Sequence, residues 1–243
     1  MYIWGENMDD NARYERNMGG ISAEEQRRLG ASRVSIIGCG ALGQLVAEEL
    51  ARVGVGEILL ADGDCFALHN LNRQIYAAEE LVGTKKTAAA EMRLRQANSL
   101  VAVKAIPEFF CEDNWEEMIG DSQVVIDAVD NIPTRWLLER CCERKGLPLI
   151  HGAISGWWGQ VATIFPGDEL MRKIYPTETS ADWTEPWGNL VFAAGTVASL
   201  QAAETVKILL NRKETLRNKL LMVDLLHREF DTIEIKEGQE GKP

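Results

Sequence analysis

Short apolar runs alternate along the chain with longer stretches in which apolar residues recur every three to four positions. The runs have the length of buried strands, and the longer stretches have the spacing of helices with one apolar face. After an opening helix over 22–30, the pattern predicts strand 34–37, helix 41–52, strand 57–61, helix 84–98, strand 101–106, helix 114–119, strand 123–128, helix 133–145 and strand 147–151. This alternation indicates a doubly wound α/β fold with a parallel sheet and right-handed crossovers.

The last third of the chain departs from that alternation. Residues 159–165 alternate as a strand does, and 166–188 form a polar, proline-containing segment of the kind that is usually functional or disordered. A long, mostly apolar helix is predicted over 190–210, followed by two strands, 219–225 and 229–235, that form a hairpin. The predicted fold class is therefore a Rossmann-like, doubly wound, mostly parallel sheet with a C-terminal antiparallel extension.

The predicted organisation is one domain with two short extensions. A chain of 243 residues, 46% of them hydrophobic, buries a sufficient core without disulfides or metal. Ser22 and Glu25 form a capping box, in which a hydroxyl and a carboxylate satisfy backbone amides three residues apart at a helix start. We therefore expect an N-terminal arm over 1–21, a single domain over 22–235 and a frayed tail over 236–243.

Acidic residues outnumber basic ones, 37 to 26, and the formal net charge is −11. Such a balance provides no broad positive surface for nucleic acid or anionic lipid. The first ten residues are polar and acidic, unlike a secretion signal, and the longest apolar stretch, 190–203, contains polar residues. It falls short of the roughly 18 apolar residues that a membrane span needs. We therefore expect a cytoplasmic protein with neither nucleic acid nor a membrane as its partner.

The five cysteines contain no C-x-x-C pair. An odd number in a chain of this length fits reduced thiols better than a disulfide framework. A four-cysteine zinc site would need two such pairs, so the sequence argues against structural zinc.

A glycine-rich turn follows the first predicted strand. Gly38, Gly40 and Gly43 stand in the spacing G-x-G-x-x-G between that strand and a helix, which is the context of the dinucleotide-binding fingerprint. Glycines let backbone amides approach a phosphate, and the helix N-terminus favours its charge. Asp62 ends the second strand, where a carboxylate can accept hydrogen bonds from a ribose. The pattern indicates adenosine binding; the alternatives are glycines needed for steric reasons alone and an Asp62 that only caps the turn.

Cations follow the second strand. Segments 70–74 and 83–86 place Arg73, Lys85 and Lys86 beside the expected nucleotide. A nicotinamide cofactor carries only a diphosphate bridge and needs few cations. A triphosphate cleaved at its α-phosphorus needs several, because charge builds on its oxygens and on departing pyrophosphate. The cluster therefore favours a triphosphate, with solvated surface charges as the alternative.

Two carboxylates end the fourth predicted strand. Asp127 and Asp130 stand where open α/β sheets bind ligands, and could hold Mg²⁺ on the phosphates. The alternatives are that Asp127 is buried against a backbone amide and that Asp130 caps the helix at Pro133. We favour burial for Asp127 and the metal role for Asp130.

These segments, taken in order, resemble the ThiF/MoeB/HesA family, the prokaryotic relatives of ubiquitin-activating enzymes. The resemblance covers about residues 13–226 and is far more specific than the glycines alone. The matching segments are 13–17, 38–43, 62–64, 70–74, 86, 127–131, 151–153, 159–161 and 199–202.

The resemblance implies that residues 22–235 form an ATP-binding adenylyltransferase domain. In that family ATP adenylates the C-terminal glycine carboxylate of a small ubiquitin-like sulfur-carrier protein, ThiS/MoaD-like, and pyrophosphate is released. ATP and Mg²⁺ are the implied cofactors, and a two-fold homodimer is the implied assembly. The first step needs no protein nucleophile, because the attacking carboxylate is already ionised and positioning with charge neutralisation suffices.

The resemblance also implies residue roles. Asp62 would hold the ribose, Asp130 would bind Mg²⁺, and Arg16 would reach the triphosphate bound by the partner subunit. The expected catalytic residues are Arg16, Arg73, Lys86 and Asp130, with Asp130 as the metal ligand, and the expected nucleotide-binding residues are Gly38, Gly40, Gly43, Asp62, Asp64, Asn70, Gln74 and Asn131.

The chain departs from the family pattern at its cysteines. Family members often carry zinc-binding C-x-x-C pairs, one of them where this chain reads Met-Arg-Lys-Ile over 171–174. Many also place a reactive cysteine about where Thr184 stands, whereas here no cysteine follows Cys142. We therefore expect a chain without its own catalytic cysteine or zinc site, which stops at the acyl-adenylate and leaves sulfur delivery to a separate donor protein.

Some residues keep two interpretations. Trp183 and Trp187, with Trp157 and Trp158, could hold a glycine-rich carrier tail against flat aromatic walls, or could pack in the core or at a dimer interface. His151 ends a strand without an evident acid–base partner in the sequence, so it is assigned no catalysis.

Three other functions remain open. An NAD-dependent oxidoreductase would leave the cations unexplained. An enzyme similar to tRNA threonylcarbamoyladenosine dehydratase would share the nucleotide site, although the net charge of −11 weighs against it. A non-catalytic scaffold would be expected to lose phosphate-handling residues such as Arg73 and Lys86, which are present.

Overall fold

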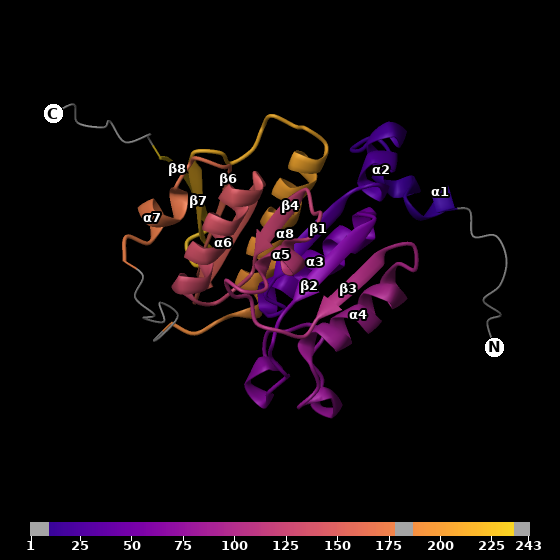
Figure 1. Cartoon of the computed structure of the whole chain (residues 1–243), viewed down its shortest axis with the longest axis horizontal. Helices are drawn as coiled ribbons and strands as arrows, with labels where there is room; N and C mark the ends of the chain where they lie inside the picture. Colours follow the sequence, from indigo (N-terminus) through magenta and orange to yellow (C-terminus); the bar gives the residue numbers. More distant parts are fainter. Residues whose placement is uncertain (1–9, 178–186, 236–243) are drawn as a thin grey trace.

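A twisted eight-stranded sheet with helices on both faces forms the computed structural model, which describes residues 10–177 and 187–235 (Figure 1). The strand order is β3-β2-β1-β4-β5-β6-β7-β8. Neighbours from β3 to β5 pair in parallel, and those from β5 to β8 pair antiparallel. The strands are β1 (Arg33–Ile37), β2 (Glu57–Ala61), β3 (Ala102–Ile106), β4 (Val124–Asp127), β5 (Leu149–Ser155), β6 (Trp158–Ile164), β7 (Lys219–Asp224) and β8 (Glu229–Glu234). The predicted fold class is confirmed.

The helices divide between the two faces of the sheet. Helices α3, α4 and α8 pack on one face, and α5 and α6 cover the other. The α-helices of the described residues are α1 (Asp10–Arg13), α2 (Ala23–Gly30), α3 (Ala41–Val53), α4 (Lys86–Ala97), α5 (Trp115–Ile119), α6 (Ile132–Lys145), α7 (Leu170–Ile174) and α8 (Val191–Leu209), with 3₁₀ turns η1 (Glu15–Asn17), η2 (Leu68–Asn70) and η3 (Glu79–Leu81). No described helix is both long and apolar enough to cross a bilayer.

The core consists of two apolar layers separated by the sheet. Successive side chains of a strand point to opposite faces. In β1, for example, Ile36 belongs to the layer beneath α3 and α8, and Ile37 to the layer beneath α6. Strands that are buried on both faces read as continuous apolar runs, which explains why the sequence pattern located them.

One hairpin differs from the prediction. The expected strands 147–151 and 159–165 are β5 and β6, which pair antiparallel from Leu149↔Ile164 to Ser155↔Trp158 and are joined at Gly156 and Trp157. Strand β5 continues to Ser155, beyond the end of β4, because β6 supplies its hydrogen-bond partners there. Gly156 has φ +56°, a left-handed conformation that suits glycine in a two-residue hairpin turn.

The predicted polar segment 166–188 and the two predicted extensions differ in how far they are described. The segment 166–188 contains the short helix α7, which buries Leu170 and Met171 in the core. The described part of the arm packs on the domain, where Asn98 Nδ2 donates to the Tyr14 hydroxyl at 2.9 Å. Trp183, Thr184 and the tail 236–243 lie outside the described residues. The boundaries 1–21, 22–235 and 236–243 stay predictions.

Candidate functional site

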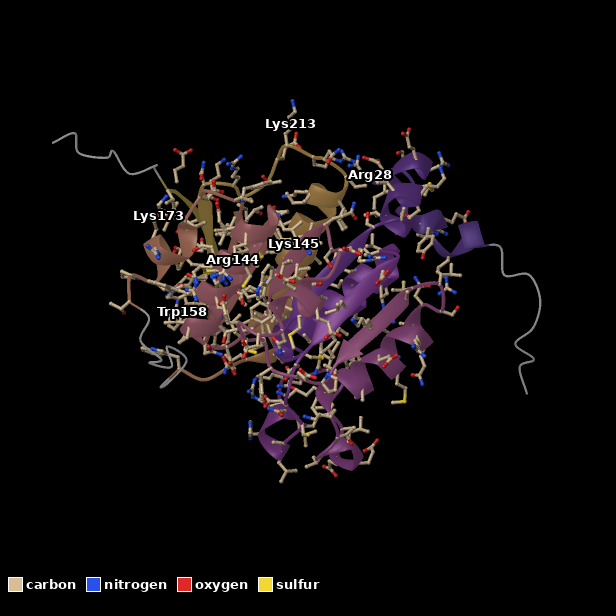
Figure 2. The ribbon with its side chains drawn as sticks, viewed as in Figure 1. Arg28, Arg144, Lys145, Trp158, Lys173 and Lys213 are labelled. Atoms are coloured by element: carbon tan, nitrogen blue, oxygen red, sulfur yellow. The ribbon has the colours of Figure 1, made fainter. Side chains whose placement is uncertain are left out.

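A cavity of about 510 Å³ lies at the carboxyl ends of β1, β2 and β4. This edge of the sheet is where α/β folds place their ligand sites, because strand ends and helix starts converge there. The loops that follow β2 extend beyond the sheet at the lower edge of Figure 1, whereas Arg28 and Lys213 lie at the upper edge in Figure 2. Every expected site residue lines the cavity except Gly43 and Arg16: Gly38, Gly40, Asp62, Asp64, Asn70, Arg73, Gln74, Lys86, Asp130 and Asn131.

The glycine-rich turn joins β1 to α3. Gly38 has φ +98°, and a Cβ there would meet the Ala128 carbonyl oxygen at 2.4 Å, so the turn packs directly on β4. A Cβ on Gly43 would lie 1.9 Å from the Gly38 carbonyl oxygen, so this glycine lets α3 close on the turn. Around Gly40 the nearest atom would be Gln74 Nε2 at 3.9 Å, which leaves the backbone open to the cavity.

Gly43→Ala is expected to lower the free energy of unfolding by about 4 kcal/mol or more, because the added methyl group collides with backbone that cannot move away. Chemical denaturation monitored by circular dichroism measures this. Gly195→Ala is the matched control, since a Cβ at this helical position of α8 meets nothing within 4 Å. It should stabilise the protein by about 0.5–1 kcal/mol. Equal effects of the two substitutions would contradict the packing assigned to Gly43.

Asp62 is bonded to the backbone of both neighbouring turns. Its Oδ2 accepts from the Cys39 amide at 2.6 Å, and its Oδ1 accepts from the Asp64 amide at 2.8 Å. The carboxylate therefore stands beside the glycine turn at the cavity wall. These contacts hold Asp62 in place and leave it half-buried at the point where a ribose would lie.

Two of the expected cations, Arg73 and Lys86, reach the cavity from different elements, and Arg135 of α6, which the sequence analysis did not name, lines it as well. Arg73 donates through one guanidinium nitrogen to the His69 carbonyl at 2.8 Å and to Asn72 Oδ1 at 2.9 Å. Lys86, at the start of α4, is 6% exposed, and its Nζ lies 2.7 Å from Asp64 Oδ2. Asp64 thus holds the lysine at the cavity wall in the described structure.

Gln44 holds two parts of the site together, and the sequence analysis missed it. This fully buried side chain of α3 donates to the Cys39 carbonyl at 2.9 Å and to Gln74 Oε1 at 3.4 Å. Its oxygen accepts from the Tyr76 amide at 2.9 Å. The glycine turn and the segment that contains Arg73 are therefore fixed to one another. In the predicted helix Gln44 lies opposite the apolar side that carries Leu42 and Val46, so the sequence pattern gave no signal for its burial.

The carboxylates at the end of β4 have different environments. Asp127 is fully buried and accepts from the Val129 amide at 3.1 Å, as the favoured alternative expected. The helix α6 is capped by Asn131, whose Oδ1 accepts from the Thr134 amide at 3.0 Å. The interpretation of Asp130 as the helix cap is therefore wrong. Asp130 is exposed at the cavity wall, with Asn131 Nδ2 donating to it at 3.3 Å.

His151, for which no acid–base partner was evident in the sequence, lies beside a carboxylate in the structure. His151 Nδ1 lies 2.7 Å from Asp127 Oδ2, and both side chains are fully buried. The two residues are Cα partners in the parallel pairing of β4 with β5. Twenty-four positions separate them in the chain, so only the strand register brings them together.

Burial lowers the pKa of His151 below its ordinary value near 6.5, because removal from water disfavours the imidazolium more than the bond to Asp127 favours it. The unfolded chain therefore binds this proton first as the pH falls. His151 thus contributes stability above about pH 6.5 that is lost as the pH falls toward its folded pKa. Between about pH 6.5 and pH 5, the free energy of unfolding of His151→Asn should therefore fall less than that of the wild type. Denaturation at each pH measures this difference.

His227 is the control for that profile, because its pKa shifts in the opposite direction. The exposed imidazole is 2.9 Å from Asp224 Oδ2, and this hydrogen bond raises the pKa of His227. Its stabilising effect is present at low pH and is lost as the pH rises through the folded pKa. His227→Asn should therefore change the pH profile with the opposite sign. Profiles that are the same for both variants would contradict the assignment for His151.

The structure does not bring Arg16 to the cavity of its own chain. Arg16 lies in η1, and its neighbour Asn17 donates to the Val53 carbonyl at the C-terminal end of α3. The cavity lies at the other end of that helix, about 20 Å away along its axis. The cross-subunit role of Arg16 stays a prediction.

Three of the described tryptophans, Trp157, Trp158 and Trp187, lie at or beside the β5–β6 turn. Trp158 and Trp187 make an edge-to-face contact with ring centroids 5.5 Å apart, and Trp157 lies 4.7 Å from the ring of Phe192. Trp187 is 61% exposed and Trp157 is 40% exposed. Whether they touch a carrier stays a prediction.

Known proteins resemble this chain over nearly its whole length. The SAMP-activating enzyme E1 of Haloferax volcanii is 38% identical over 227 residues, covering 91% of this chain and 84% of that protein. Protein HesA, vegetative, of Trichormus variabilis is 32% identical, with 88% and 81% covered. Adenylyltransferase and sulfurtransferase MOCS3 of Dictyostelium discoideum is 34% identical, and the chain spans about half, 53%, of its length.

Solved structures share the fold. The structure of E. coli MccB with SeMet MccA has a TM-score of 0.80 at 22% identity, covering 95% of this chain and 74% of that one. SeMet PaaA has a TM-score of 0.79 at 22% identity, with 98% and 77% covered. The model of the ThiF family matches residues 14–243. With this match and the 38% identity to an activating enzyme, the chain belongs to the ThiF family of adenylyltransferases.

Proposed function

We propose that the chain uses ATP to adenylate the C-terminal glycine carboxylate of a small ubiquitin-like sulfur-carrier protein, ThiS/MoaD-like, and releases pyrophosphate. The observation that carries the proposal is one cavity that joins an open glycine turn, a ribose-type carboxylate, the cations Arg73 and Lys86, and an exposed carboxylate. The names of the relatives, an activating enzyme and an adenylyltransferase, support the same class of reaction.

The cavity fits a nucleoside triphosphate. Gly40 leaves space for a phosphate against the backbone amides at the start of α3, and Asp62 stands beside it to accept from ribose hydroxyls. Arg73 and Lys86 line the same wall and can neutralise the outer phosphates. Asn70 is buried, with its Oδ1 accepting from the Ala67 amide at 2.9 Å, and so fixes the turn that leads to Arg73.

Asp130 fits a magnesium ligand. Within residues 10–177 and 187–235, no three His, Cys, Asp or Glu side chains are grouped to hold a metal by themselves. Mg²⁺ in nucleotide sites is usually held by one or two carboxylates together with the phosphates, so a single exposed carboxylate is sufficient. Bound Mg²⁺ would supply positive charge at the phosphates during pyrophosphate departure.

The residues then act by positioning and charge. A carboxylate oxygen of the carrier attacks the α-phosphorus, an acyl–phosphate bond forms, and the bond to the β-phosphate breaks with its electrons leaving on pyrophosphate. Arg73 and Lys86 stabilise the charge that develops there. Asp62 and Gly40 hold the adenylate in line with the incoming carboxylate, which needs no general base because it is already ionised.

The assembly and the following steps belong to the same proposal. We infer a homodimer in which Arg16 reaches the partner's nucleotide, since η1 lies far from the cavity of its own chain. We also infer a separate sulfur-donor protein, because no cysteine follows Cys142.

Exchange of labelled pyrophosphate into ATP tests the proposal. The purified chain is incubated with ATP, Mg²⁺ and each of a panel of ubiquitin-like carriers, and exchange is expected only with a carrier that keeps its C-terminal glycine. A carrier lacking that glycine is the matched control. Tight NAD(H) binding together with no exchange across the panel would contradict the proposal.

The proposal also predicts the absence of a covalent enzyme–carrier conjugate. Burial raises the pKa of the Cys39 and Cys142 thiols, so these two are unreactive, whereas Cys65 lines the cavity and is exposed. Mass spectrometry after incubation with carrier and ATP should show the carrier adenylate and no mass equal to the sum of both chains less one water, which a thioester between them would have. A thiol-sensitive conjugate that disappears in Cys65→Ser would refute this prediction.

A further inference from the structure

A buried polar cluster lies beneath the loop that carries Asp130, and the proposed chemistry does not use it. Asp127, Arg135 and His151 are buried, and Gln160 and Tyr175 are partly buried. These residues, which we name the Arg135 cluster, come from β4, α6, β5, β6 and the residue after α7. Burying polar groups costs free energy unless they are hydrogen-bonded, so the contacts that these side chains make determine whether the cluster is stable.

The cluster holds the backbone of Val129 through both its amide and its carbonyl group. The Val129 amide donates to Asp127 Oδ1 at 3.1 Å, and the Val129 carbonyl accepts from one terminal nitrogen of Arg135 at 2.7 Å. Asp130 is the next residue, so the orientation of its backbone follows from these two bonds. Arg135 itself is 6% exposed and lines the cavity.

The other terminal nitrogen of Arg135 points to Tyr175. It donates to the Tyr175 hydroxyl at 2.9 Å, and that hydroxyl also accepts from Gln160 Nε2 at 2.6 Å. The Tyr175 ring lies edge-on to His151, with centroids 5.7 Å apart. Side chains of α6, β5 and β6 therefore hold Tyr175 at the point where the chain leaves α7.

Arginine is the side chain that can make both bonds. Its planar guanidinium presents several donors in fixed directions, so it can serve a carbonyl and a hydroxyl at the same time. A lysine would bring one compact ammonium group to the same place, and it would hydrogen-bond well to only one of the two acceptors, the Val129 carbonyl or the Tyr175 hydroxyl. The positive charge is balanced nearby by Asp127, whose Oδ2 lies 4.0 Å from the guanidinium.

We propose that Arg135 is a positioning residue that ties the orientation of Asp130 in the cavity to the placement of Tyr175 at the end of α7. When Tyr175 is docked, Arg135 holds the Val129 carbonyl and Asp130 faces the phosphates. When Tyr175 is displaced, the loop that carries Val129 and Asp130 becomes less ordered. The proposal rests on the metal role of Asp130 in the proposed function.

Amide hydrogen exchange tests the coupling without any ligand. Tyr175→Phe removes one hydroxyl, and Arg135→Lys replaces the planar guanidinium and its two terminal donors with a single ammonium group. Both should speed exchange of the amides over 129–131 by about 10-fold or more, because one charge-assisted hydrogen bond is lost. Arg144→Lys is the matched control on the same helix, where Arg144 is ion-paired with Glu112 at the surface, and it should leave these amides unchanged.

Metal dependence provides the second measurement. The Mg²⁺ concentration that half-saturates ATP binding, measured by calorimetry without carrier, should rise about 10-fold in Arg135→Lys. Tyr175→Phe should shift it in the same direction. The double variant should be no worse than Arg135→Lys alone, because both changes act through the same bond.

The outcomes separate this proposal from the proposed function. Unchanged exchange over 129–131 in a folded Tyr175→Phe protein overturns the coupling, as does an additive effect in the double variant. If Arg135→Lys fails to fold, Tyr175→Phe decides alone. A wild-type chain that lacks pyrophosphate exchange refutes the proposed function instead, and leaves the ligand-free measurement valid.

Discussion

Asp130→Ala is expected to lower carrier-dependent ATP–pyrophosphate exchange by about 1000-fold or more, because the substitution removes the carboxylate that would hold Mg²⁺ on the phosphates. The fold should survive, since Asp130 is exposed and the adjacent helix is capped by Asn131 rather than by Asp130. Initial exchange rates at saturating ATP measure the loss, and a thermal melt checks the fold.

Asp121→Ala is the matched control for that experiment. Asp121 is another exposed carboxylate, paired with Arg33 at 3.4 Å near the opposite end of β1. It should leave the exchange rate unchanged. Exchange at the wild-type rate in Asp130→Ala, with a normal melt, would reject the metal role of Asp130. Partial recovery of Asp130→Asn at high Mg²⁺ would support it, because the amide oxygen keeps a weaker ligand in place.

Arg73→Ala is expected to lower kcat for exchange by about 1000-fold, because an arginine at a transferring phosphoryl group stabilises charge that appears in the transition state. Arg73 is anchored by the His69 carbonyl and Asn72, so its guanidinium is already oriented at the cavity wall. Since these partners are exposed, loss of the side chain should cost little stability. Steady-state rates at several ATP concentrations separate kcat from KM.

Two further variants make the result for Arg73 specific. Arg73→Lys should recover only part of the rate, because an ammonium group cannot reproduce the planar fork. Arg95→Ala removes an exposed arginine of α4 that is paired with Glu91 at 2.6 Å, and it should have no effect. A rise in KM for ATP with unchanged kcat in Arg73→Ala would show a role in binding alone and would contradict the assigned role in the transition state.

The prediction of the fold rested on local signals that tertiary structure did not override. Strands β1, β2 and β4 are buried on both faces, so their apolar runs could be recognised in the sequence without knowledge of their neighbours. The glycine turn was legible for the same reason, because its spacing reports steric demands between residues five positions apart, Gly38 and Gly43. Expected residues such as Asp62, Arg73 and Lys86 then met at one cavity because parallel strands end at the same edge.

Other features depended on partners far away in the chain. Strand β5 was predicted to end at His151 but continues to Ser155, because its added residues bond only to β6. The short helix α7 was missed within a polar segment, since its stability comes from burying Leu170 and Met171 rather than from a local pattern. The short range of sequence patterns accounts for both differences.

The sequence by itself determined the order of the strands and of the longer helices, the phosphate-type turn, and most of the charged residues that gather at the carboxyl edge of the sheet. Only the tertiary structure decided that Asp127 meets His151, that Gln44 fastens the turn to the segment with Arg73, and that Arg135 joins Val129 to Tyr175. The physical reason is that periodicity and spacing reflect the burial and local conformation of each segment. Strand register and helix packing, in contrast, set which side chains from distant parts of the chain come into contact.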